Sequence, residues 1–302
     1  MKKLLVALLI LNIIVSIFFY YNIPKKTNIN YTLNNSTDLL ERCNPDLVPS
    51  VIKSAQKNVI GISVEVSVKD PPNRILKLPP ISLTSRGTGF LRESNVIVSA
   101  RHVFLNTIFD LKRIGFPFLL NMNSIPESDR YEYKLYAIYD EGGNVKKYPL
   151  TLIAMGRLGE HRDYMVLKAK ENLPNIKPLE TGKKLKNGDV VYNGAYLPIG
   201  SSYPSITSEY NSIITDVIKC NFKGRVSEVI KNMPVNLVGV DTYYRIAIDV
   251  EPGYSGGPIF NTEGQVAAMI LATTKNFTYA ISIQEIDNYI KNIDRKNIFP
   301  KK

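Results

Sequence analysis

The stretch EPGYSGGPIF, residues 251–260, surrounds a single serine, Ser255, with three glycines and two prolines. Glycine adopts backbone conformations that other residues resist and lets another segment approach closely, whereas proline fixes φ and lacks an amide donor. The stretch therefore favours neither helix nor strand, and it predicts a sharply turned loop that carries a hydroxyl. Taken alone, such a loop is either a structural turn or the support of a nucleophile.

Two nucleophile patterns fit this loop, and the order of residues along the chain separates them. The letters GYSGG, residues 253–257, match both G-x-S-x-G, the pattern of α/β-hydrolases, and G-x-S-G-G. An α/β-hydrolase places its histidine after the serine, but His102 and His161 both precede Ser255. The order histidine, acid, serine remains, with His102 after the apolar run NVIVSA and Asp163 directly before YMVLKA.

Short apolar runs separated by Gly, Pro, Asn and Asp fill most of the chain after residue 50. Such runs predict an all-β protein, in which two sets of about six strands would form two similar barrels. The division between them is expected near residues 171–186, and residues 105–130 are interpreted as an inserted loop. Near the end, Ile283, Ile286, Ile290 and Ile293 recur at helical spacing and predict a C-terminal helix.

The N-terminus carries the apolar run LLVALLILNIIVSIFFYY, residues 4–21, after Lys2 and Lys3. A helix of this length spans about 27 Å, close to the roughly 30 Å hydrocarbon core of a bilayer. We expect residues 1–21 to be an uncleaved signal anchor, followed by a tether over residues 22–50 and a periplasmic or extracellular body. Secretion after cleavage of a signal peptide is the alternative.

Composition limits the other functions of the chain. Hydrophobic residues make up 44% and charged residues 22%, which is typical of a globular protein. The net charge is +11, but no nucleic-acid motif accompanies it, so we expect no nucleic-acid partner. The two cysteines, Cys43 and Cys220, are free to form one disulfide in an exported chain, although their spacing does not show that they pair. No metal site or cofactor is expected.

Five blocks of the sequence, in order, resemble the motifs of trypsin-like serine proteases, most closely the bacterial HtrA/Deg-type branch. The blocks are GTGFLRESNVIVSARHVF (87–104), RDYMVLKA (162–169), GDVVYNGAYLP (188–198), GRVSEV (224–229) and EPGYSGGPIFNTEGQVAAMI (251–270). The resemblance implies two perpendicular six-stranded antiparallel β-barrels with a catalytic cleft between them. The first barrel would cover residues 51–175, with His102 and Asp163. The second would cover residues 176–302, with Ser255 and the C-terminal helix.

The implied chemistry is hydrolysis of peptide bonds through an acyl-enzyme. Asp163 would orient His102, His102 would deprotonate Ser255, and the amides of Gly253 and Ser255 would form the oxyanion hole. Tyr254 stands where zymogen-activated relatives carry an aspartate, so we expect no activation by a newly freed N-terminus. Fewer than 50 residues follow the serine, so we also expect no PDZ domain.

The specificity pocket of this family is lined by residues before the serine and by the strands after it. The corresponding residues here are Asp249, Met269, Ile270, Leu271 and Ala280. A carboxylate at Asp249 would select basic side chains, but the strand pattern YRIAIDVEP equally allows it to face solvent. Two alternatives to a peptidase stay open: a membrane-tethered inactive homologue that binds peptides, and an esterase with the same three residues.

Overall fold

The structure is a computed structural model. It describes residues 48–68, 82–113, 131–141, 144–156, 162–199, 216–220, 222–231, 242–248, 250, 253–274 and 277–293. The chain divides into two compact units, residues 1–43 and 44–302, and all of the described residues belong to the second.

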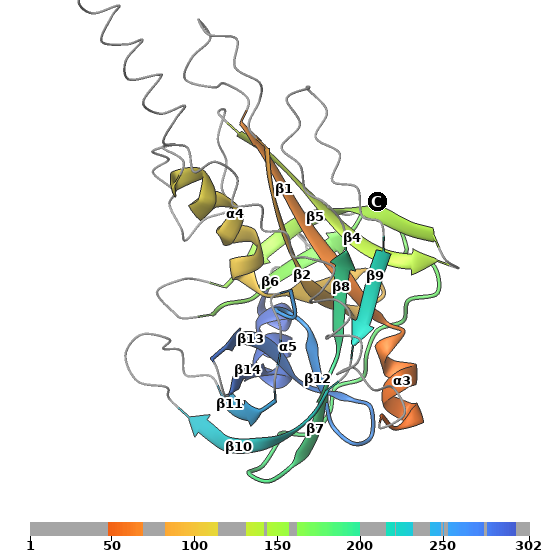
Figure 1. Ribbon diagram of the computed structural model, residues 1–302, viewed down its shortest axis with the longest axis vertical. Helices are drawn as coiled ribbons and strands as arrows, with labels where there is room; N and C mark the ends of the chain where they lie inside the picture. Colours follow the sequence, from red (N-terminus) through yellow and green to blue (C-terminus); the bar gives the residue numbers. More distant parts are fainter. Residues whose placement is uncertain are drawn as a thin grey trace, which may run out of the picture. The chain divides into compact units, whose positions relative to one another are not determined.

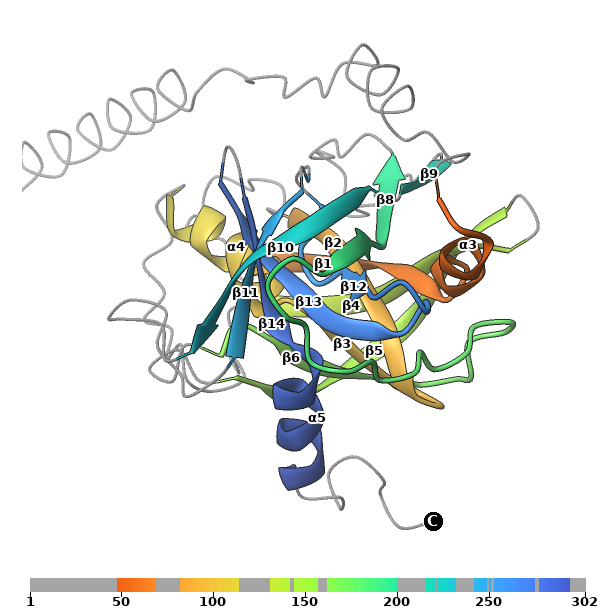
Figure 2. The same cartoon turned by 90° about the horizontal axis from the view of Figure 1, so that it is seen from below.

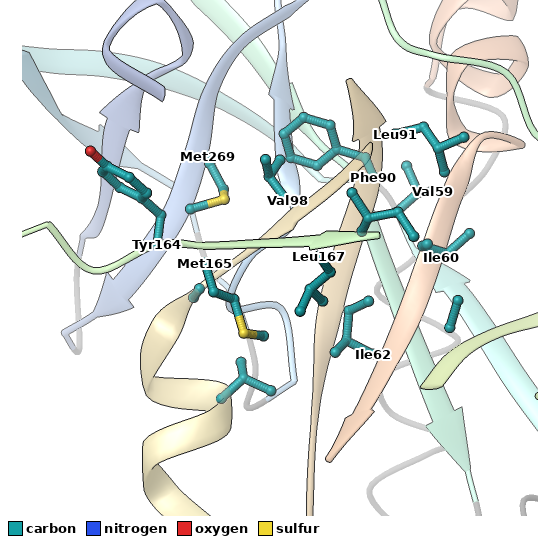
Figure 3. Close-up of a cluster of buried hydrophobic side chains, with 14 of the residues drawn as sticks. Val59, Ile60, Ile62, Phe90, Leu91, Val98, Tyr164, Met165, Leu167 and Met269 are labelled. Atoms are coloured by element: carbon teal, nitrogen blue, oxygen red, sulfur yellow. The ribbon is translucent and has the colours of Figure 1, made fainter. Parts of the chain in front are cut away.

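Six antiparallel strands close into a first barrel in the order β1-β2-β3-β6-β5-β4 (Figure 1). They are β1 (Val59–Val68), β2 (Ser82–Glu93), β3 (Val96–Ser99), β4 (Tyr131–Glu141), β5 (Asn144–Met155) and β6 (Met165–Ala169). Alternate residues of a strand share one face, and Ile60, Ile62, Val64 and Val66 of β1 are all fully buried. The apolar face of this strand therefore belongs to the core, part of which appears in Figure 3.

Six further strands close a second antiparallel barrel in the order β10-β11-β14-β13-β12-β7. They are β7 (Val190–Asn193), β10 (Lys223–Lys231), β11 (Thr242–Ala247), β12 (Pro258–Phe260), β13 (Val266–Thr273) and β14 (Thr278–Ser282). Residues 170–189 connect the two barrels and include the predicted division at residues 171–186. Together with the C-terminal helix, this arrangement confirms the predicted all-β fold class.

Three smaller elements accompany the barrels. β8 (Ala195–Ile199) and β9 (Asp216–Cys220) form a two-stranded antiparallel sheet, and helix α3 (Ser50–Gln56) precedes β1. The buried side-chain amide of Gln56 donates to the carbonyl of Ala195 at 2.7 Å. This bond ties α3 to the start of β8.

Helix α4 (Arg101–Arg113) corrects the prediction of an inserted loop, which began at residue 105. The sequence of α4 contains Val, Phe, Thr and Ile, which have lower helix propensity than Ala or Leu. Tertiary packing outweighs this, because Val103, Phe104 and Thr107 are buried at helical spacing. The rest of the predicted loop, residues 114–130, lies outside the described residues.

Helix α5 (Ile283–Asn292) confirms the predicted C-terminal helix and continues directly from β14 (Figure 2). Ile283, Ile286 and Ile290 are buried, and Ile293 packs against the core as the helix ends. The isoleucine spacing therefore marks the face of α5 that contacts the barrels.

Two predictions from the N-terminal part lie outside the described residues. These are the transmembrane helix over residues 1–21 and the pairing of Cys43 with Cys220, since Cys43 is not described. None of the helices in the described part of the chain combines the length and apolar character needed to cross a bilayer.

Candidate active site

The Ser255 loop joins β11 to β12 and has the sharp backbone that its glycines predict. Gly253 and Gly256 have φ values of +100° and +85°, in the region that side chains other than glycine resist. A Cβ on Gly256 would lie 2.3 Å from the carbonyl oxygen of Thr88 and 2.4 Å from Oγ of Ser99. Glycine at 256 is therefore required both by backbone conformation and by the approach of the first barrel.

Thr88 of β2 binds this loop to the first barrel. Its amide donates to the Ser255 carbonyl at 2.9 Å, and its hydroxyl donates to the Gly253 carbonyl at 2.8 Å. Its own carbonyl accepts from Oγ of Ser99 at 2.7 Å. On the same side, the amide nitrogen of Ala100 would lie 2.6 Å from a Cβ on Gly256. The serine loop therefore contacts Ser99 at the end of β3 and Ala100, which lie three and two residues before His102.

His102 and Asp163 form a two-point contact. His102 lies in the first turn of α4, and Asp163 lies on the connection between β5 and β6. The His102 amide donates to Oδ1 of Asp163 at 2.9 Å, and Nδ1 of His102 lies 2.7 Å from Oδ2. A carboxylate accepts, so Nδ1 carries the proton and Nε2 is left with a lone pair. The side chains are 28% and 31% exposed, which leaves the imidazole accessible to a substrate.

The Ser255 hydroxyl makes no hydrogen bond to the imidazole among the described residues. The backbone at Gly256 lies close to Ser99 and Ala100, which precede His102 in the sequence. Bonds between catalytic groups are often long without substrate and shorten when it binds.

The amides of the loop divide into two groups. The Gly256 amide donates to the Ile270 carbonyl at 2.8 Å, and the Gly257 amide donates to the Tyr254 carbonyl at 2.8 Å. The amides of Gly253 and Ser255 have no acceptor within the part of the chain that the structure describes.

Four of the residues predicted to line a specificity pocket lie on β13 and β14, and they divide into two pairs. Met269 is fully buried beside Tyr164 and Val98 (Figure 3), and it belongs to the core cluster together with Leu271. Ile270 and Ala280 are paired across β13 and β14 and lie outside that cluster. Ile270 also bonds to the serine loop, since its amide donates to the Gly257 carbonyl at 2.8 Å.

Asp249, the remaining predicted pocket residue, lies outside the described residues. Residues that the sequence did not single out also contribute to the site, chiefly Thr88, Ser99 and Arg101. All three lie in the block 87–104 that contains His102. Their closeness in sequence to this predicted base is the signal that could have identified them.

The model of the trypsin-like peptidase domain matches residues 87–269, more than half of the 302-residue chain. This chain belongs to the trypsin-like peptidase domain family. The match contains His102, Asp163, Ser255 and the other residues described above up to Met269. Three residues that were predicted to line the pocket lie after its end: Ile270, Leu271 and Ala280, the last of them on β14.

Curated relatives and solved structures give a similar result. "Serine protease HtrA-like" of Staphylococcus aureus, strains USA300 and COL, is 26% identical over 116 residues, covering 33% of this chain and 15% of the relative. The similarity thus spans a small part of these relatives. The structure of the HtrA-type protease AlgW with decapeptide has a TM-score of 0.52 at 15% identity, covering 80% of this chain and 66% of that one. A second AlgW structure with decapeptide, of a variant, has a TM-score of 0.53 at 14% identity, with the same coverage. Both show a shared fold.

Proposed function

We propose that this protein is a serine endopeptidase that uses Ser255, His102 and Asp163. The observation that carries the proposal is the two-point contact between His102 and Asp163, at the strand end that the serine loop touches. Membership of the trypsin-like peptidase domain family supports it independently.

The proposed reaction begins with proton transfer. Nε2 of His102 accepts the Ser255 proton while Oγ attacks the scissile carbonyl carbon, and Asp163 stabilises the imidazolium that forms. The imidazolium then gives this proton to the leaving amine as the C–N bond breaks, which leaves an acyl-enzyme on Ser255. Water, deprotonated by His102, hydrolyses the ester and restores the serine.

The oxyanion hole is assigned to the amides of Gly253 and Ser255. Their lack of an acceptor among the described residues supports this assignment, because preorganised donors need no rearrangement when negative charge develops. The bonds from Thr88 to the carbonyls of Gly253 and Ser255 hold the same loop and keep these amides in place.

The substrate side chain next to the cleaved bond is assigned to the face of Ile270 and Ala280. Both residues are apolar, and Ile270 is bonded directly to the serine loop. Met269 and Leu271 pack in the core cluster, to which Ile270 and Ala280 do not belong. The proposed pocket thus favours apolar side chains unless Asp249 contributes its charge.

The proposed substrates are polypeptides, in line with the decapeptide in the AlgW structures. Residues 1–21 are proposed to anchor the protein with the barrels exported, because their apolar length suits a bilayer. A fractionation of cells expressing the full chain tests this: the protein should be in the membrane fraction and degradable by protease added outside.

Labelling with a fluorophosphonate probe tests the proposed enzyme. The folded full-length protein should be labelled, and Ser255→Ala should abolish labelling and the cleavage of unfolded protein. No labelling of folded protein would favour the inactive peptide-binding homologue. Labelling and hydrolysis of small esters without peptide cleavage would favour the esterase.

A further inference from the structure

Asp163 lies on a connection without regular secondary structure, yet its carboxylate has to keep a fixed position. Both of its carboxylate bonds within the described residues go to His102, and 31% of its side chain is exposed. A group of this kind keeps productive geometry only if the surrounding residues hold its backbone. Two residues outside the proposed catalytic set, Arg101 and Tyr289, contact the connection that carries Asp163.

Arg101 holds the connection from the side of the first barrel. It is only 1% exposed, and its Nη1 donates to the Gly156 carbonyl at 2.6 Å. Its amide lies 3.4 Å from the Asp163 carbonyl, to which it donates. Gly156 in turn donates to the Tyr164 carbonyl at 2.8 Å. Arg101 therefore links Gly156, which directly follows β5, to the backbone of Asp163.

The burial of Arg101 is unfavourable unless its charge and donors are used. Burial lowers the pKa of Arg101, while the negative charge of Asp163 acts in the opposite direction. Removing a guanidinium from water is costly, and a buried one is retained where it makes specific bonds. The bonds from Nη1 and from the amide of Arg101 are both made to the connection that carries Asp163.

Tyr289 of α5 holds the same connection from the other side. Its hydroxyl donates to the Met155 carbonyl at 2.9 Å, next to the Gly156 carbonyl that Arg101 binds. Its ring packs edge-on against Tyr164, with centroids 4.9 Å apart. The guanidinium carbon of Arg162 lies 6.0 Å from the centroid of the same ring. The residues on both sides of Asp163 are thus in contact with Tyr289.

We propose that Arg101 and Tyr289 are positioning residues that together hold Asp163 in its two-point contact with His102. The inference rests on the proposed peptidase function, since it concerns the same site. On this inference, the position of Asp163 in the first barrel depends on helix α5, which follows Ser255 in the sequence.

The test compares full-length wild type with Tyr289→Phe, Arg101→Met and Arg101→Lys. We measure kcat and KM for peptide hydrolysis and the rate of fluorophosphonate labelling. Loss of the Tyr289 hydroxyl should lower kcat about tenfold, and loss of the Arg101 charge about a hundredfold, because small misplacements of catalytic groups have effects of this size. KM should not change. Arg101→Lys should recover part of the loss, since its ammonium also donates to a carbonyl.

A double-mutant cycle separates positioning from a general structural effect. If Tyr289 acts through Asp163, Tyr289→Phe should have no further effect on labelling in an Asp163→Ala background. The matched control is Asp287→Asn, which breaks the ion pair of α5 with Arg92. It should lower the melting temperature without changing kcat.

Two results would overturn the inference alone: wild-type kcat in Tyr289→Phe, or an equal loss in the Asp163→Ala background. Wild type that is not labelled, or labelling that survives Ser255→Ala, would overturn the proposed function and this inference with it. If Arg101→Met does not fold, Tyr289→Phe and Arg101→Lys decide the question.

Discussion

The hydroxyl of Thr88 donates a hydrogen bond to the carbonyl of Gly253 at 2.8 Å, across 165 residues of sequence. The amide of the same residue donates to the Ser255 carbonyl at 2.9 Å. One residue of the first barrel therefore fixes two carbonyls of a loop in the second. The directions of the amides in that loop follow from these bonds.

Thr88→Val should slow fluorophosphonate labelling of Ser255 about tenfold, because the oxyanion donors lose their support. The free energy of unfolding should fall by roughly 1–2 kcal/mol, since the Gly253 carbonyl loses its donor. Labelling kinetics and urea unfolding measure the two effects. Thr84→Val is the matched control on the same strand, because the Thr84 hydroxyl has no hydrogen-bond partner among the described residues. Equal effects of the two variants would contradict the role of Thr88.

Gly256→Ala should abolish labelling and destabilise the fold, because a methyl group would lie 2.3 Å from the Thr88 carbonyl oxygen. Gly188→Ala provides the comparison: its φ is +89°, but a Cβ there would meet nothing within 4 Å. It should lower the free energy of unfolding by only about 1–2 kcal/mol and leave labelling intact. A Gly256→Ala protein with normal activity would show that the first barrel does not approach the loop as described.

Asp163→Asn should lower kcat by about 10⁴-fold with little change in stability, because an amide in place of the carboxylate favours the wrong tautomer of His102. Peptide hydrolysis and thermal unfolding together measure this. Asp189→Asn serves as a control, since Asp189 accepts from the Lys186 amide in an exposed turn of the connection between the barrels. Activity of Asp163→Asn within tenfold of wild type would remove Asp163 from the catalytic set.

Arg92→Met should lower the free energy of unfolding by roughly 2–3 kcal/mol, because the carboxylate of Asp287 would lose its cationic partner and keep only the Thr181 hydroxyl. Nε and Nη2 of Arg92 each lie 2.9 Å from Asp287, and the side chains are only 7% and 19% exposed. Denaturant unfolding measures the loss. Lys146→Met breaks an exposed pair with Glu141 and should cost at most about 1 kcal/mol. A larger loss in Lys146→Met than in Arg92→Met would contradict this ranking.

The sequence predicted those parts of the fold that depend on periodic apolar residues. The run VIGISVEVSV became β1, and the isoleucines after residue 282 became the buried face of α5. It did not predict α4, because Val103 and Phe104 have a local preference for extended structure and only their burial against β1 and β2 stabilises the helix.

At the site, the sequence predicted the proposed catalytic residues, but it did not predict the residues that hold their backbone in place. His102 and Asp163 were found from their motifs and lie in contact. Thr88, Arg101 and Tyr289 act through bonds to backbone carbonyls distant in sequence, and such bonds leave no local pattern. For the same reason, the sequence could not separate Met269 in the core from Ile270 beside the loop.

Helix α5 begins at Ile283, after all of the strands in both barrels. A growing polypeptide therefore cannot form the bond from Tyr289 to Met155 until nearly every described residue has left the ribosome. Until that moment the connection that carries Asp163 lacks the contact with α5 that we propose holds it in place.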